Sequence, residues 1–178
     1  MVKKDSYLFR AWEYIKSFEP HVQSWTDTDA IIKAIEKTFF HTGKNVKFDY
    51  GAVRFVLIGK DFVIKWDYDA ECAENIGGCE DELRVYRQHM SSGYAHLLAP
   101  CSRIYWHGRY FYIMPRIGNI GGQAHLYKEI QCFVSAAEFH WLQNNIGDLH
   151  SWNWGIKDGH AVVIDYACPH RCGLIFFF

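Results

Sequence analysis

Residues 147–155 read Gly-Asp-Leu-His-Ser-Trp-Asn-Trp-Gly and join an apolar helical pattern to a short predicted hairpin. Asp148 and Asn153 stand five residues apart in this segment. Asp165 ends the apolar run that follows, so a hairpin is expected to return it to the side of Asn153. A loop with a capping Asp and a left-handed Asn is the alternative interpretation of these residue types. The surrounding elements decide between the two.

Alternating apolar residues upstream predict two groups of antiparallel strands. The first group has three strands and is followed by a helix between residues 71 and 90. The second group is a hairpin that turns at His107-Gly108. The predicted strands are 46–50, 53–57, 62–66, 102–106 and 109–114.

Helical spacing predicts two helices before the strands, at 6–18 and 30–37, and a buried helix at 128–145. Between strands and buried helix, the Gly-rich segment 115–122 is interpreted as a hinge. The last hairpin is predicted at 155–164. The chain therefore reads two helices, three strands, helix, two strands, hinge, helix, loop and hairpin.

This order, together with Asp148, four residues and Asn153, and then Asp165 after a hairpin, resembles the protein-kinase-like superfamily. The form Gly-Asp-Leu-His-x-x-Asn-x-Gly is similar to the catalytic loop of aminoglycoside and choline kinases and of minimal kinases of phages and bacterial effectors. The resemblance covers about residues 44–167. It implies that Asn153 and Asp165 bind Mg²⁺ and that Asp148 orients the acceptor hydroxyl.

Two further positions match the resemblance. Lys65 ends the third predicted strand in the setting Phe-Val-Ile-Lys, where the family's Lys binds ATP phosphates. Glu82 on the next helix is the expected partner of that Lys, with Glu80 as the alternative. A strand-edge Lys and a solvated helix Glu are the plainer interpretations. His150 is expected either to touch the transferred phosphate or to order the loop by a hydrogen bond.

The chain also departs from the family pattern. The phosphate-covering loop of kinases has several glycines, whereas this chain offers only Gly51 there. Arg54 is either a partial substitute that donates hydrogen bonds to phosphate or a surface charge. Ile146-Gly147 replaces the His-Arg of signalling kinases, so phosphorylation control is not expected. Eleven residues follow Ala167, so we expect neither an activation segment nor a helical substrate platform.

Composition excludes several function classes. A formal net charge of -1 argues against a protein that coats nucleic acid. No apolar run approaches the roughly 20 residues of a membrane span, and a cytoplasmic location is expected, in the host if a phage or effector encodes the chain. The six cysteines are expected to be reduced. Cys168, His170 and Cys172 are three potential zinc ligands, where a closed site requires four.

We therefore predict an α+β, minimal kinase-like bilobal fold. Its parts are a helical extension (1–43), an N-lobe with a five-stranded antiparallel sheet and one helix (44–114), and a hinge with a truncated C-lobe (115–178). The implied function is ATP- and Mg-dependent phosphotransfer, slightly favouring a protein hydroxyl over a small molecule. The alternatives are a pseudokinase-like module that binds a host or partner protein, and a nucleotidyl transferase.

Overall fold

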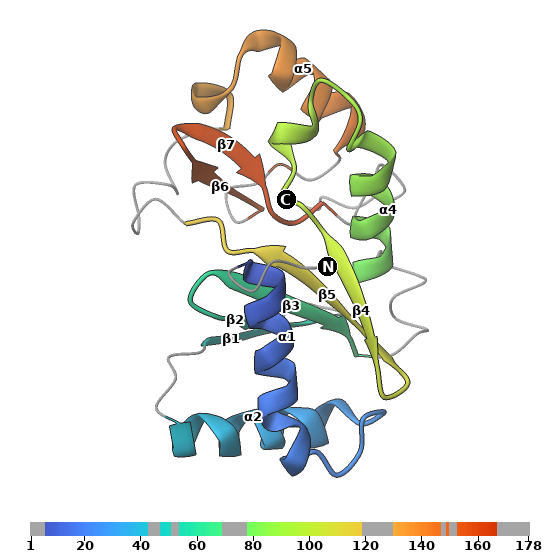
Figure 1. The fold of residues 1–178 in the computed structure, drawn as a ribbon. Coiled ribbons are helices and arrows are strands. Elements are labelled where there is room, and N and C mark those ends of the chain that lie inside the picture. The colour runs from blue at the N-terminus through green and yellow to red at the C-terminus, as the bar shows by residue number, and fades with distance from the viewer. Residues whose placement is uncertain are drawn as a thin grey trace, which may run out of the picture. The chain divides into compact units, whose positions relative to one another are not determined.

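The computed structural model of the chain describes residues 6–42, 47–50, 54–68, 78–118, 130–146, 149 and 153–166. These residues form an α+β fold with a five-stranded antiparallel sheet and a second sheet of two strands (Figure 1). The chain divides into two compact units: Met1–Ala70 with Ser102–Arg116, and Glu71–Cys101 with Ile117–Phe178. The three-part division at residues 43 and 114 stays a prediction.

The first unit contains the five-stranded sheet, in the order β1-β2-β3-β5-β4. Its hairpin between β4 and β5 turns through His107 (φ 47°) and Gly108 (φ 82°), two positive φ values in succession as in a type I′ turn. The five predicted strands are thus confirmed, with ends shifted by one residue at most. They are β1 (Lys47–Tyr50), β2 (Arg54–Ile58), β3 (Phe62–Asp67), β4 (Ser102–Trp106) and β5 (Arg109–Pro115).

One face of this sheet is covered by α1 (Tyr7–Phe18), which Figure 1 shows lying along it, and α2 (Thr28–Thr42) packs against α1. Both predicted helices are confirmed, and Ser6 caps α1 by accepting from the N–H of Phe9 at 3.2 Å. Buried side chains from helices and sheet form a single cluster. It includes Ala11, Ile15, Phe18, Ile31 and Ile35 from the helices and Phe55, Leu57, Ile64, Trp66, Phe111 and Ile113 from the strands.

The burial of this cluster makes the two helices part of the first unit. Trp66, Phe55 and Phe111 are each 0% exposed. Complete burial of such a side chain contributes about 1.5–3 kcal/mol. The sheet face that carries these residues is therefore covered by α1, and α2 completes the same core.

The second unit holds the remaining elements. α4 (Cys79–His89), predicted as the helix of the N-lobe, is grouped with this unit and not with the sheet. A short turn of 3₁₀ helix, η2 (Ala95–Leu97), follows. The hairpin of β6 (Trp154–Lys157) and β7 (His160–Val163) turns through Asp158 (φ 52°) and Gly159 (φ 84°), as predicted.

The buried helix predicted at 128–145 is wrong in extent and in burial. The described part consists of a 3₁₀ turn, η4 (Ile130–Phe133), and a separate helix, α5 (Ala136–Asn145), in which only Leu142 is buried. The cause is Ser135, whose side chain accepts from the N–H of Glu138 at 3.3 Å while the Glu138 carboxylate accepts from the N–H of Ser135 at 2.6 Å. This capping box starts a new helix at that point.

Candidate functional site

The hairpin of β6 and β7 brings the backbone of Asp165 next to that of Asn153. The carbonyl oxygen of Asn153 accepts hydrogen bonds from the N–H of Ile164 at 2.7 Å and from the N–H of Asp165 at 3.2 Å. Because β6 begins directly after Asn153 and the hairpin has a two-residue turn, the returning chain passes Asn153 at Ile164 and then Asp165. The expected proximity of these two residues is confirmed.

Asn153 and Asp165 supply hard oxygen donors from adjacent backbone positions. Asn153 is 8% exposed and Asp165 is half-buried. Mg²⁺ is commonly bound by one or two protein oxygens, with water and phosphate oxygens completing its six ligands, so this pair fits that ion. Within the described ranges, no three His, Cys, Asp or Glu side chains gather closely enough to hold a metal ion by themselves.

Tyr166 anchors the chain directly after Asp165. Its ring is 2% exposed, and its hydroxyl donates a hydrogen bond of 2.6 Å to the carbonyl oxygen of Ala99. Ala99 is in turn tied to the hairpin, because its N–H donates to the carbonyl oxygen of Val163 at 2.9 Å. The position of Asp165 is therefore fixed on both sides, by Asn153 before the hairpin and by Tyr166 after it.

Glu82 lies in the electrostatic surroundings of the same tyrosine. Burial raises the pKa of Tyr166 far above its usual value, and the nearby Glu82, Cys101, Tyr86 and Asp165 raise it further. Glu82 itself is 0% exposed on α4. Glu82 and Asp165 are thus both near enough to Tyr166 to raise its pKa, and the tyrosine stays protonated as a hydrogen-bond donor.

Lys65 occupies the centre of the first unit's sheet. It lies on the middle strand, opposite Val56 of β2 and Tyr112 of β5, and it is 5% exposed. Its neighbours along the strand, Ile64 and Trp66, point into the core beneath α1 and α2, so the Lys65 side chain lies on the other face. A strand-edge Lys that extends into solvent does not describe this residue.

Arg54 shares that face with Lys65. It lies directly opposite Asp67, two residues beyond Lys65 on β3, and it is half-buried. Side chains two residues apart on a strand lie on the same face, so this side of the sheet carries the cationic Lys65 and Arg54 together with the carboxylate of Asp67. Gly51, Asp148 and His150 lie outside the described residues, as do Cys168, His170 and Cys172.

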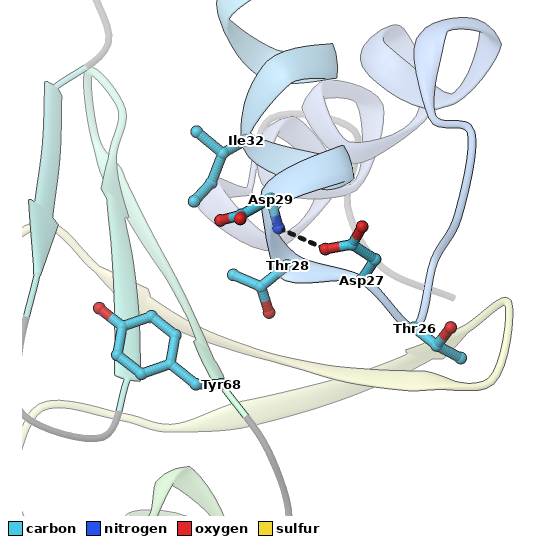
Figure 2. A pocket seen from close by; sticks show the side chains of 6 residues that line it. All are labelled: Thr26, Asp27, Thr28, Asp29, Ile32 and Tyr68. Atoms are coloured by element: carbon cyan, nitrogen blue, oxygen red, sulfur yellow. Dashed lines mark hydrogen bonds between the residues drawn. The ribbon is translucent and has the colours of Figure 1, made fainter.

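A separate hollow of about 530 Å³ lies in the first unit at the start of α2. Figure 2 shows Tyr68 on one side and Thr28, Asp29 and Ile32 on the other. Asp27 accepts from the N–H of Asp29 at 2.9 Å, as a helix cap does. The acidic character of this hollow is explained by helix capping.

Sequence reasoning did not find the bond between Tyr166 and Ala99. A large ring with one hydroxyl after a buried strand is a signal for a buried hydrogen bond. Its acceptor is a backbone carbonyl 67 residues away, which no residue type reveals.

No family model matches the chain, and no curated protein matches it either. In the part of the chain that the structure describes, no helix has the length and apolar character needed to cross a membrane.

Proposed function

We propose that the chain is an ATP- and magnesium-dependent phosphotransferase with a minimal kinase-like bilobal fold, and that its acceptor is a protein hydroxyl. The observation that carries the proposal is the hydrogen bond of 3.2 Å from the backbone N–H of Asp165 to the carbonyl oxygen of Asn153, which holds the two residues next to each other. In this proposal Asn153 and Asp165 hold Mg²⁺, which neutralises charge on the phosphates when it is bound.

Lys65 binds the phosphates of ATP in the same proposal, with Arg54 as a second donor. Two observations support this assignment: Lys65 is buried on the middle strand, and both cations occupy the sheet face that α1 and α2 leave uncovered. In this proposal the phosphate oxygens of ATP accept hydrogen bonds from the cationic side chains on this face. The resemblance to kinases assigns to Glu82, which is fully buried on α4, the role of the residue that orients this Lys.

The reaction transfers the γ-phosphoryl group. The acceptor oxygen attacks the γ-phosphorus, the bond from that phosphorus to the bridging oxygen breaks, and ADP leaves. The hydroxyl proton passes to the carboxylate of Asp148, whose role comes from the resemblance to kinase catalytic loops. Positioning and charge neutralisation supply most of the catalysis in such reactions, so a small set of rigidly held polar groups suffices.

The test uses the purified chain with Mg²⁺ and ATP labelled at either the γ- or the α-phosphate, alone and with a cell lysate. The expected result is γ-label on protein, which Asp165→Asn and Lys65→Met abolish. Asp158→Asn and Lys60→Met are matched controls: they change an exposed residue of the same type in the neighbouring turn and should keep the activity.

Other outcomes identify the alternatives. Transfer of α-label would show nucleotidyl transfer and overturn the kinase proposal. Thermal stabilisation by Mg-ATP without any transfer would leave a nucleotide-binding module of the pseudokinase kind. No stabilisation by Mg-ATP would contradict the proposed site altogether.

A further inference from the structure

A second hollow, of about 240 Å³, lies in the C-terminal unit on one face of the hairpin. Its floor is apolar and is formed by Leu98, Pro100, Ile117 and Val162. None of the residues that line it belongs to the proposed phosphotransfer site. The hollow therefore requires an explanation of its own.

The floor can form because Gly155 has no side chain. Gly155 and Val162 are directly opposite in the hairpin, so they share a face. A Cβ at Gly155 would lie 3.0 Å from Cγ2 of Ile117, so the glycine lets Ile117 approach the strand. The N–H of Ile156 holds the adjacent backbone by donating to the carbonyl oxygen of Gly118 at 3.3 Å.

The rim carries hydrogen-bond donors on that same face. Lys157 and His160 are directly opposite each other in the hairpin, so their side chains emerge side by side next to the floor. Both are exposed, and neither side chain has a hydrogen bond or ion pair with the described part of the chain. Asp158, in the turn, is the one carboxylate among the lining residues.

His96 adds a third nitrogen group from a different segment. Its Nε2 lies 2.7 Å from Oε1 of Glu138, whose other oxygen accepts from the N–H of Ser135 at 2.6 Å. These contacts, the backbone hydrogen bond first, lower the pKa of Glu138 to about 2. The Glu138 charge is thus engaged by α5 and His96, and His96 is held in place at the rim.

Size and chemistry together point to one kind of occupant. The hollow is smaller than the roughly 300–1,000 Å³ of pockets that enclose a whole small molecule. It holds about eight waters at about 30 Å³ each, enough for one or two apolar side chains. Lys157 and His160 at the rim complement a carboxylate placed just outside the apolar floor.

We propose that this hollow is a docking site for a segment of a partner protein in which an apolar side chain stands within about three residues of an Asp or Glu. The apolar side chain fills the floor of Leu98, Ile117 and Val162. The carboxylate meets Lys157 and His160. Such a site gives a small enzyme or binding module affinity for its partner through residues separate from those that perform chemistry.

A random library of 12-residue peptides displayed on phage, selected on the purified full-length chain, tests the proposal. The enriched sequences should share an apolar residue close to an Asp or Glu. A fluorescent peptide of the consensus sequence is then titrated against variants by anisotropy. Because an exposed ion pair contributes up to about 1 kcal/mol and charge reversal adds repulsion, Lys157→Glu and His160→Glu should each weaken binding about fivefold to tenfold.

Lys33→Glu is the matched control, since it makes the same charge change at an exposed position of α2 in the other unit. It should leave the affinity within about twofold, and thermal melting confirms that all three variants are folded. Ala95→Leu, which fills the hollow without a change of charge, should also weaken binding. No enrichment, a consensus without a carboxylate, or equal binding by the charge-reversal variants would each overturn the proposal. None of these readouts requires ATP, so they are independent of the phosphotransfer test.

Discussion

The carbonyl oxygen of Asn153 accepts the N–H of Asp165 at 3.2 Å, so the two proposed metal ligands are joined through the backbone and not only through a shared ion. Their spacing is set by the length of the hairpin between them. The turn of that hairpin therefore governs the site, although it contributes no side chain to it.

Replacing Gly159 with Ala should loosen this hairpin. Gly159 has φ +84°, a conformation that costs an L-residue about 1–2 kcal/mol. The N–H groups of Ile164 and Asp165 should exchange with solvent about fivefold to thirtyfold faster, and the stabilisation by Mg-ATP should decrease. Gly93→Ala is the control, because a Cβ there meets nothing within 4 Å. If the exchange rates of Ile164 and Asp165 do not change, the turn does not control the spacing of Asn153 and Asp165.

Tyr166→Phe should destabilise the protein by about 1–3 kcal/mol, since it leaves the buried carbonyl of Ala99 without its donor. The free energy of unfolding in urea measures the effect. Tyr105→Phe removes a hydroxyl from a residue that is 60% exposed and should change the stability little. Equal effects of the two substitutions would contradict the structural role of the hydrogen bond.

The protein should lose stability in alkaline solution partly through Tyr14. Burial raises the pKa of Tyr14 from 10.0 to about 12. Because the folded state holds this proton more tightly, its contribution is complete below pH 10 and is lost as the pH rises towards 12. A pKa difference of this size corresponds to about 3 kcal/mol. Tyr14→Phe should therefore show a shallower fall in unfolding free energy between pH 9 and 11.5.

Glu138→Gln should act at the opposite end of the pH range. The pKa of Glu138 is lowered from 4.5 to about 2, so its contribution is present above pH 4.5 and is lost as the pH falls through 2. Gln can still accept in the capping box, but the loss of the carboxylate charge beside the N–H of Ser135 and His96 should cost about 0.5–2 kcal/mol near pH 7. This difference from the unsubstituted protein should shrink as the pH falls towards 2. Glu36→Gln, at an exposed position of α2, should show no such pH-dependent difference.

Ile35→Ala should test whether the N-terminal helices belong to the first unit. Ile35 is 0% exposed in the cluster shared with the sheet, so its truncation should cost about 2–5 kcal/mol. Thermal unfolding followed by circular dichroism measures the change. Lys33→Ala, two residues earlier and exposed, is the control. If Ile35→Ala has no effect on stability, α2 does not contribute to the core of the first unit.

Local patterns predicted most of the elements, because turn residues and apolar alternation act over a few positions. His107-Gly108 and Asp158-Gly159 each adopt the two positive φ values that their residue types favour. The return of Asp165 to Asn153 follows from the same short-range rule. Each of these features depends only on residues within its own hairpin.

Longer-range features could not be predicted in the same way. At Ser135, the helical spacing predicts a continuous helix and the capping-box residues predict a new one. The hydrogen bonds between Ser135 and Glu138 show that the capping box forms. The placement of α1 over the face of Trp66, with α2 packed against α1, depends on residues far apart in the chain. Periodicity shows that a face is apolar and not which element covers it.

One face of the large sheet is buried in the core that it shares with α1 and α2, so the two faces of the sheet differ in chemical character. A charged ligand has no access to the face filled by Phe55, Leu57 and Trp66. The proposed binding of phosphate therefore uses the side that carries Arg54 and Lys65. A substitution that detaches the helices would do more than destabilise the fold, because it would expose an apolar sheet face that favours aggregation.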